Sequence, residues 1–298
     1  MSELDPQVIA LLERLKAAGA PPVGELPALE MRRNFAAAAP GAFGPVEPIA
    51  SVEDRETDGG IDLRIYRPVE TDEPRPALVY FHGGGWVVGS LDTHDGVVRA
   101  LAHGSGRVAI AVDYRLAPEH PFPAGLEDAA AATRWVLDNA AELGLDPARI
   151  AVGGDSSGAT LAAVVARRLP VDLQVLVCPV LDHRFDTESY ERFAEGYFLT
   201  RDAMRWYWGQ YVGGDDGASA DASPLRATGF AGLPPAVILV AGCDPLRDEG
   251  LAYAAKLEEA GGQVTVLRYD GMIHNFIRFA ASIDRAGEAL ADVARRLA

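Results

Sequence analysis

From residue 76 onward the chain alternates short, unbroken apolar runs with segments that have helical spacing. Because unbroken apolar runs suit strands that are covered on both faces, these runs predict a buried, mostly parallel sheet. The intervening segments predict helices, and the alternation is typical of a three-layer α/β domain. The predicted strands cover residues 76–81, 107–112, 149–154, 173–180, 235–242 and 263–269. The predicted helices cover residues 93–104, 125–144, 157–169, 246–261 and 279–298.

The segment before residue 76 has a different pattern. It predicts two helices, over residues 5–19 and 26–39, followed by strands over 46–57 and 61–68 that an Asp-Gly-Gly turn joins into a hairpin. We expect this antiparallel hairpin at one edge of the sheet.

Residues 183–221 interrupt the alternation with an aromatic-rich stretch that is helical in its middle. This stretch fits either an ordinary surface excursion or a lid over the strand ends, where ligands bind in such sheets, and we favour the lid. We therefore expect a single domain over residues 1–298, with a helical cap from roughly residues 1–45 and 183–221.

The charge balance excludes several classes of partner. The net charge of −16 argues against a nucleic acid and against an anionic lipid surface, since both require a basic face. No apolar run is long enough to span a bilayer, so we expect no membrane insertion. The acidic N-terminus does not resemble a signal peptide, and Cys178 and Cys243 favour buried thiols in a reducing compartment. These features together predict a cytoplasmic protein.

The stretch Gly-Gly-Asp-Ser-Ser-Gly at residues 153–158 joins a predicted strand to a predicted helix. This is the context of a nucleophile elbow, G-x-S-x-G, in which glycines flank a serine at the tip of a strained turn. Centring the motif on Ser156 places Gly154 and Gly158 at the flanking positions, whereas centring it on Ser157 places Asp155 and Ala159 there. Ser156 is therefore the predicted nucleophile, and Ser157 contributes its backbone N–H.

A second glycine-rich motif, His-Gly-Gly-Gly-Trp at residues 82–86, follows the strand over 76–81. Consecutive glycines let backbone N–H groups converge on a negatively charged oxygen, as in the oxyanion holes of esterases. We assign the predicted oxyanion donors to the N–H groups of Gly83, Gly84 and Ser157. A phosphate-binding loop is disfavoured because no G-K-[ST] ending follows. Trp86, beside these glycines, is a candidate for the substrate pocket.

A serine nucleophile requires a base and an acid. His274 follows the last predicted strand. The chain order Ser…acid…His is the order found in folds that carry the nucleophile elbow. Asp244 directly follows the strand over 235–242 and is the predicted acid, whereas Asp248 is equally explained by the start of a helix. Four other histidines are predicted to be structural: His82 braces the glycine loop, His94 and His103 are surface residues, and His120 supports the fold. His183 opens the aromatic-rich stretch.

Five motifs of the chain stand in a characteristic order: His-Gly-Gly-Gly-Trp, Asp-Tyr-Arg-Leu-Ala-Pro-Glu-His-Pro-Phe-Pro-Ala, Gly-Gly-Asp-Ser-Ser-Gly, Asp-Pro-Leu-Arg-Asp-Glu-Gly and Gly-Met-Ile-His-Asn-Phe. Together they resemble the hormone-sensitive-lipase-like branch of the α/β-hydrolases, the bacterial family IV carboxylesterases. The resemblance runs from about residue 47 to the C-terminus. It implies an α/β-hydrolase fold with an eight-stranded sheet flanked by helices, a cap, and no metal or cofactor. It also implies a catalytic triad of Ser156, Asp244 and His274, and dimers that often form through the last strand. Ser157 departs from the family, which commonly has alanine there.

The motifs thus predict a serine hydrolase that cleaves esters of small molecules through an acyl-enzyme, and the family resemblance implies short- to medium-chain acyl esters as its substrates. An amidase, a lactonase or a sugar deacetylase would use the same triad, and the motifs do not separate these. A non-catalytic small-molecule receptor on the same scaffold is disfavoured because His274 is retained.

Overall fold

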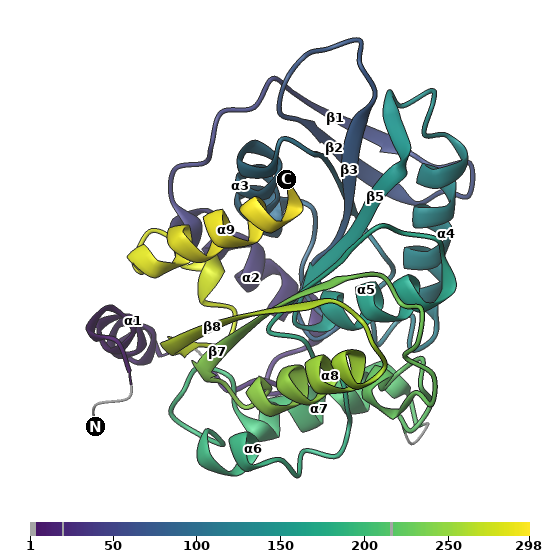
Figure 1. The fold of residues 1–298 in the computed structure, drawn as a ribbon. Coiled ribbons are helices and arrows are strands. Elements are labelled where there is room, and N and C mark those ends of the chain that lie inside the picture. The colour runs from purple at the N-terminus through teal and green to yellow at the C-terminus, as the bar shows by residue number, and fades with distance from the viewer. Residues whose placement is uncertain (1–3, 20, 215–216) are drawn as a thin grey trace.

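The structure is a computed structural model that describes residues 4–19, 21–214 and 217–298. In these residues eight strands form one sheet in the order β1-β2-β4-β3-β5-β6-β7-β8 (Figure 1). The pairs β1–β2 and β2–β4 are antiparallel, and all other neighbours are parallel. The mostly parallel eight-stranded sheet predicted from the sequence is confirmed. The strands are β1 (Ser51–Glu56), β2 (Asp62–Arg67), β3 (Arg75–Phe81), β4 (Val108–Val112), β5 (Leu145–Asp155), β6 (Gln174–Val177), β7 (Ala236–Cys243) and β8 (Val264–Ile273).

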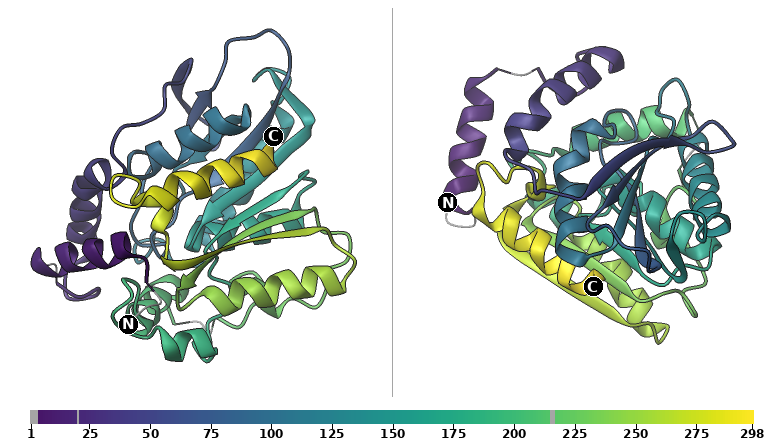
Figure 2. Two further views of the ribbon diagram at one scale, coloured as in Figure 1. Left: turned by 60° about the vertical axis from the view of Figure 1, so that its left-hand side comes forward. Right: turned by 90° about the horizontal axis from the view of Figure 1, so that it is seen from above.

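Helices cover both faces of the sheet (Figure 2). Those of the described residues are α1 (Pro6–Ala17), α2 (Ala28–Phe43), α3 (Asp95–Ser105), α4 (Ala124–Asp138), α5 (Ser157–Arg168), α6 (Glu188–Arg192), α7 (Arg201–Val212), α8 (Arg247–Glu259) and α9 (Asp284–Leu297). Three short 3-10 turns accompany them: η1 (Asp92–His94), η2 (Pro224–Arg226) and η3 (Phe276–Arg278). Helices α3 and α9 pack together in one apolar core, whereas α4, α5 and α8 belong to the core on the opposite face.

The burial of the strands follows from their composition. Every residue of β4 and β7 is buried, as expected for unbroken apolar runs in the middle of a covered sheet. Strand β8 lies at the edge of the sheet and alternates exposed and partly buried residues over most of its length. The edge position explains why Val266 is exposed in an otherwise apolar strand.

Several predicted boundaries were wrong by a few residues, and two of these differences have a clear local reason. The closing helix begins at Asp284 rather than at residue 279, because Phe279 and Ile283 are buried and fix an irregular turn before it. The Asp284 N–H donates to Gln7 Oε1 of α1 at 2.9 Å, which satisfies one free donor at the start of α9. The first strand begins at Ser51 rather than at residue 46, since Pro48 precedes it and cannot donate a ladder hydrogen bond.

The N-terminal helices and the segment after β6 approach each other. A Cβ atom on Gly24, between α1 and α2, would lie 2.7 Å from Trp206 Cδ1 of α7. Residues of α2 and α7 also pack on a shared apolar cluster around Val87 and Val88. Residues 1–3, 20 and 215–216 fall inside the ranges predicted for the cap but lie outside the described residues.

Of the helices in the described part of the chain, none is both long enough and apolar enough to cross a membrane.

Candidate active site

Ser156 occupies a strained turn between β5 and α5. Its φ is +53° and its ψ is −120°, a conformation that a side chain rarely adopts. A Cβ atom on Gly158 would lie 2.0 Å from the Phe81 carbonyl oxygen, and one on Gly154 would lie 2.5 Å from the same oxygen. Both flanking positions therefore require glycine, as expected for a serine held at the tip of a strand–helix turn.

Three predicted site residues meet at the carboxyl edge of the sheet. His274, directly after β8, places Nε2 2.9 Å from Ser156 Oγ and Nδ1 2.8 Å from Asp244 Oδ2. Asp244, directly after β7, also accepts the Leu246 N–H at 2.9 Å through its second oxygen. All three side chains are buried. The chain is thus able to pass a proton from the serine to the imidazole, while the carboxylate fixes the orientation of the ring.

The rejected acid, Asp248, has a different environment. Its carboxylate accepts the Ser189 N–H at 2.8 Å and pairs with Arg247 at 2.8 Å, so it joins α8 to α6.

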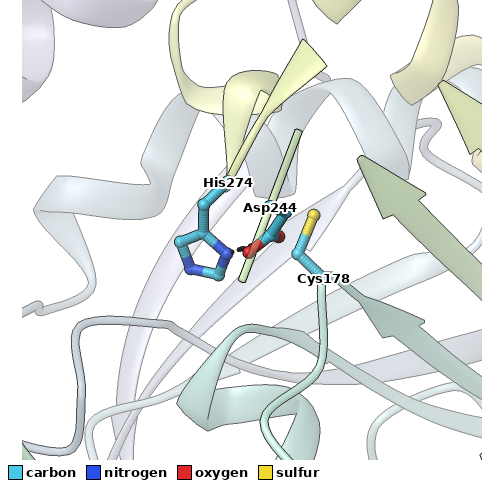
Figure 3. A group of neighbouring side chains, drawn as sticks. All are labelled: Cys178, Asp244 and His274. Atoms are coloured by element: carbon cyan, nitrogen blue, oxygen red, sulfur yellow. Dashed lines mark hydrogen bonds and ion pairs between the residues drawn. The ribbon is translucent and has the colours of Figure 1, made fainter. Parts of the chain in front are cut away.

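Cys178 lies beside the same group. Figure 3 shows Asp244 between the His274 ring and the Cys178 sulfur, and potential ligand atoms of the three residues lie within 4.8 Å of one another. Burial, with the nearby Asp244 charge, raises the pKa of the Cys178 thiol well above its ordinary value, which disfavours the thiolate that a metal would need. An ion here would also displace the hydrogen bond between His274 and Asp244. The donor set therefore fits proton transfer better than metal binding.

The structure corrects one of the predicted oxyanion donors. The N–H of Gly83 donates to Asp155 Oδ1 at 3.1 Å, so it already has a protein acceptor and is not free to bind an oxyanion. Gly84 and Gly85 instead line the cavity that contains Ser156 and His274. Their φ values of +128° and +60° require glycine, because these angles turn the chain into a curl that L side chains disfavour. In the described residues no protein acceptor binds the N–H of Gly84, Gly85 or Ser157.

Asp155, next to the serine, holds this region together. It is fully buried and accepts hydrogen bonds from Tyr80 Oη at 2.7 Å, the Gly83 N–H at 3.1 Å and Asn275 Nδ2 at 2.6 Å. Burial by itself would raise the pKa of Asp155, but His94 and the hydrogen bonds hold this pKa below its ordinary value. Asp155 is therefore a buried anion surrounded by donors.

Two histidines pack around this anion. His94 is buried rather than exposed, which corrects the prediction of a surface residue, and its Nε2 lies 3.4 Å from Asp155 Oδ2. The His82 ring stacks on Tyr114 with 4.4 Å between the ring centroids. Burial lowers the pKa of His82 to about 3 and also lowers that of His94, so both rings are neutral near pH 7.

The candidate Trp86 does not line the cavity. It is 1% exposed and stacks on Tyr211 of α7 with 4.0 Å between ring centroids. Its φ of +59° turns the side chain away from the glycine loop and into the core, so the prediction of a pocket residue was wrong.

The cavity above Ser156 has a volume of about 150 Å³ and continues into an apolar groove of about 350 Å³ between α2 and the chain around α7. Both spaces share walls from several segments: Val23, Phe35, Val88, Phe198, Tyr207 and Arg278. Phe198 and Tyr207 come from the aromatic stretch that the sequence singles out. Phe35 and Arg278 were not predicted from the sequence, although Arg278 stands only four residues after His274.

A family model for the α/β-hydrolase fold matches residues 78–278, which is more than half of the chain. The chain belongs to the α/β-hydrolase family.

Similar proteins and solved structures match the chain beyond the residues that the family model covers. The chain is 43% identical to "Carboxylesterase NlhH" of Mycobacterium tuberculosis, over 81% of this chain and 80% of that protein. It is 37% identical to "Ethyl acetate hydrolase" of Pseudomonas putida, over 99% of this chain and 98% of the relative. A solved thermostable esterase from Pseudomonas putida superposes with a TM-score of 0.94 at 38% identity, over 100% of this chain and 97% of that one. A hyperthermophilic esterase from Pyrobaculum calidifontis gives 0.92 at 40% identity, over 99% and 97%.

Proposed function

We propose that the chain hydrolyses carboxylic esters of small molecules through a Ser156–His274–Asp244 triad and an acyl-enzyme intermediate. Its membership of the carboxylesterases rests on relatives that carry esterase names at 37–43% identity. The observation that supports the mechanism best is the hydrogen-bonded chain from Ser156 Oγ through the His274 ring to Asp244.

In the first half of the proposed reaction, Ser156 Oγ attacks the ester carbonyl while His274 Nε2 accepts the hydroxyl proton. Asp244 stabilises the imidazolium through Nδ1 and does not take the proton itself. His274 then returns the proton to the departing alcohol. In the second half, His274 activates a water molecule that releases the acyl group from Ser156.

We assign the oxyanion donors to the N–H groups of Gly84, Gly85 and Ser157. These groups lie beside the serine or line its cavity and have no acceptor within the described residues. Donors that are already oriented stabilise the developing charge without reorganising, and each contributes about 3–4 kcal/mol to the barrier reduction.

The shape of the cavity favours short to medium acyl chains. About 150 Å³ next to Ser156 accommodates a few carbon atoms, and longer substrates extend into the apolar groove beyond Phe35 and Tyr207. We propose that residues of roughly 1–45 and 183–221 form a cap over this site within a single domain. Leu15 of α1, Phe35 of α2 and Tyr207 of α7 supply part of the walls of these spaces.

The proposal is tested with purified protein and a panel of p-nitrophenyl esters from two to sixteen carbons, with matched amides, lactones and acetylated sugars. We expect turnover of short and medium esters, and loss of turnover by about 10⁴-fold or more in Ser156→Ala. Ser157→Ala is the matched control, since the mechanism uses only its backbone N–H. Equal losses in both variants would contradict the assignment of the nucleophile. Turnover of amides or lactones but not of esters would identify the protein as an amidase or a lactonase. No turnover of any compound would favour a non-catalytic receptor.

Two further properties remain proposals. A second copy is proposed to pair through β8, because this strand is at the edge of the sheet and exposes Val266; a monomeric mass in analytical ultracentrifugation would contradict it. A cytoplasmic location is proposed because Cys178 and Cys243 are buried thiols rather than a disulfide; fractionation of the source cells tests it.

A further inference from the structure

The guanidinium of Arg278 is a cation in the wall of the substrate cavity. Arg278 belongs to η3, four residues after His274, and its side chain lines both the cavity that contains Ser156 and the groove that continues it. The residue is half-buried, and its Nε atom is shielded from solvent without a hydrogen-bond partner. In the described part of the chain no acidic side chain forms an ion pair with it.

The nearest charges and rings explain how this cation is tolerated. One face of the guanidinium lies over the Phe35 ring, with 4.1 Å from Cζ to the ring centroid. Asp155 contributes a favourable charge from beyond ion-pair distance, but its oxygens accept hydrogen bonds from Tyr80, Gly83 and Asn275. The burial of Arg278 lowers its pKa. Within the described residues the cation therefore has a ring and a distant anion beside it, but no acceptor for its N–H groups.

An arginine carries five N–H donors in a planar fork that matches a carboxylate with two parallel hydrogen bonds. Buried donors are nearly always paired, so an unpaired guanidinium inside a binding cavity indicates that the bound molecule supplies the acceptor. A structural arginine would instead be expected to meet a protein carboxylate or several carbonyl oxygens, as Arg107 does with Asp172 and with the carbonyl groups of Ala77, Arg149 and Leu297.

We propose that Arg278 binds a carboxylate of the substrate, and that the preferred substrates are esters with a carboxylate a few carbon atoms from the scissile bond. This inference rests on the proposed ester hydrolysis and specifies its substrate class. The net charge of −16 repels anions at long range, so a preference for anionic substrates requires a cation inside the binding cavity.

The carboxylate has two chemical sources. In a half-ester of a dicarboxylic acid the carboxylate lies in the acyl part. In an O-acylated hydroxy acid it lies in the alcohol part. Each source has a neutral partner of similar shape in which an isopropyl group replaces the carboxylate. The acyl-side pair is monoethyl glutarate and ethyl 5-methylhexanoate, and the alcohol-side pair is O-acetyl-lactate and 3-methyl-2-butyl acetate.

The experiment measures kcat and KM for both pairs by pH-stat titration with the wild-type protein and with Arg278→Met, Arg278→Lys and Arg134→Met. Arg134 is an exposed arginine on α4 and controls for the loss of one positive charge. For at least one pair we expect Arg278→Met to lower the anionic-to-neutral ratio of kcat/KM at least tenfold, chiefly through KM. The neutral ester should change less than threefold, Arg278→Lys should retain part of the preference, and Arg134→Met should match the wild type. The pair that responds identifies the source of the carboxylate.

Two outcomes would overturn the inference. If Arg278→Met lowers both members of each pair in parallel, Arg278 only supports the site. If the wild-type protein hydrolyses the neutral esters and ignores both anionic ones, the cation does not bind substrate carboxylates. Failure of the proposed function is distinct from both, because then no ester of either pair is hydrolysed. If Arg278→Met does not fold by thermal melting, Arg278→Lys decides alone: an unchanged anionic-to-neutral ratio and unchanged KM values for the anionic esters would then refute the carboxylate contact.

Discussion

Glu249 in α8 provides a quantitative prediction about stability. Its side chain is 1% exposed, and one carboxylate oxygen accepts the N–H groups of Leu181 at 2.5 Å and Asp182 at 2.9 Å. Burial raises the pKa of Glu249 from its ordinary value of 4.5 to about 8, against the opposing effect of these two hydrogen bonds. Glu249 is therefore protonated in the folded protein near neutral pH.

The sign of the pH dependence follows from this shift. Because the folded protein binds the Glu249 proton more tightly than the unfolded chain does, its contribution to stability is complete below pH 4.5 and is lost as the pH rises through about 8. At about 1.4 kcal/mol for each pH unit in this window, the loss amounts to about 5 kcal/mol. The two hydrogen bonds join α8 to the chain that follows β6.

The Glu249→Gln variant removes the titration and keeps the side-chain oxygen that accepts both N–H groups. We expect the free energy of unfolding of the variant, relative to wild type, to rise by several kcal/mol between pH 5 and pH 9. The measurement is urea denaturation across this range, followed by tryptophan fluorescence and by esterase activity. Glu258→Gln, an exposed change on the same helix, should leave the wild-type profile unchanged. Parallel profiles for wild type and Glu249→Gln would refute the reasoning.

Three other changes test the site. Gly158→Ala places a Cβ atom 2.0 Å from the Phe81 carbonyl oxygen, so we expect a loss of about 3 kcal/mol or more in thermal unfolding and of most activity; a native melting curve would contradict the required glycine. Asp155→Asn turns an N–H₂ group toward surrounding donors, and we expect the free energy of unfolding in urea to fall by about 3–5 kcal/mol and kcat to fall as well. An unchanged kcat would show that Asp155 does not position the glycine loop for the reaction. Tyr207→Ala widens the cavity and should raise the octanoate-to-acetate ratio of kcat/KM about tenfold; a constant ratio would place the acyl chain elsewhere.

The parts of the site that the sequence predicted are those defined by contiguous residues and by chain order. The turn around Ser156 is recognisable because Gly154 and Gly158 exclude a Cβ atom for local reasons, within one short stretch. Asp244 and His274 each follow directly after a strand, and parallel strands bring their carboxyl ends to one edge of a sheet. Local composition and topology were therefore sufficient to bring these three residues together.

The two wrong site assignments depend on backbone direction. The sequence shows that residues 83–85 are glycines but not which of their N–H groups faces the serine. The structure shows only that the Gly83 N–H is bound to Asp155, 72 residues away, and that the next two glycines have positive φ; the proposed assignment of the donors rests on these two observations. Trp86 is similar: a φ of +59° sends the ring into the core against α7, and the sequence contains no local signal for that angle.

The walls of the cavity could not be predicted for a different reason. Phe35 comes from α2, Tyr207 from α7 and Arg278 from η3, and only the packing of the cap segments on the sheet makes them neighbours. A substrate preference is therefore a property of tertiary packing, even where the reaction type is readable from motifs.

Asp155 explains why separate parts of the chain meet at one point. It ends β5 directly before Ser156, one of its oxygens accepts from Tyr80 and Gly83 at the end of β3, and the other accepts from Asn275 directly after His274. A single buried carboxylate thus ties the serine turn, the glycine loop and the histidine loop to one another. An amide at this position would offer one acceptor and one donor to partners that all donate, so only an acid satisfies the arrangement. Because the same anion also offsets the charge of Arg278 at a distance, it leaves the N–H groups of that cation for a ligand.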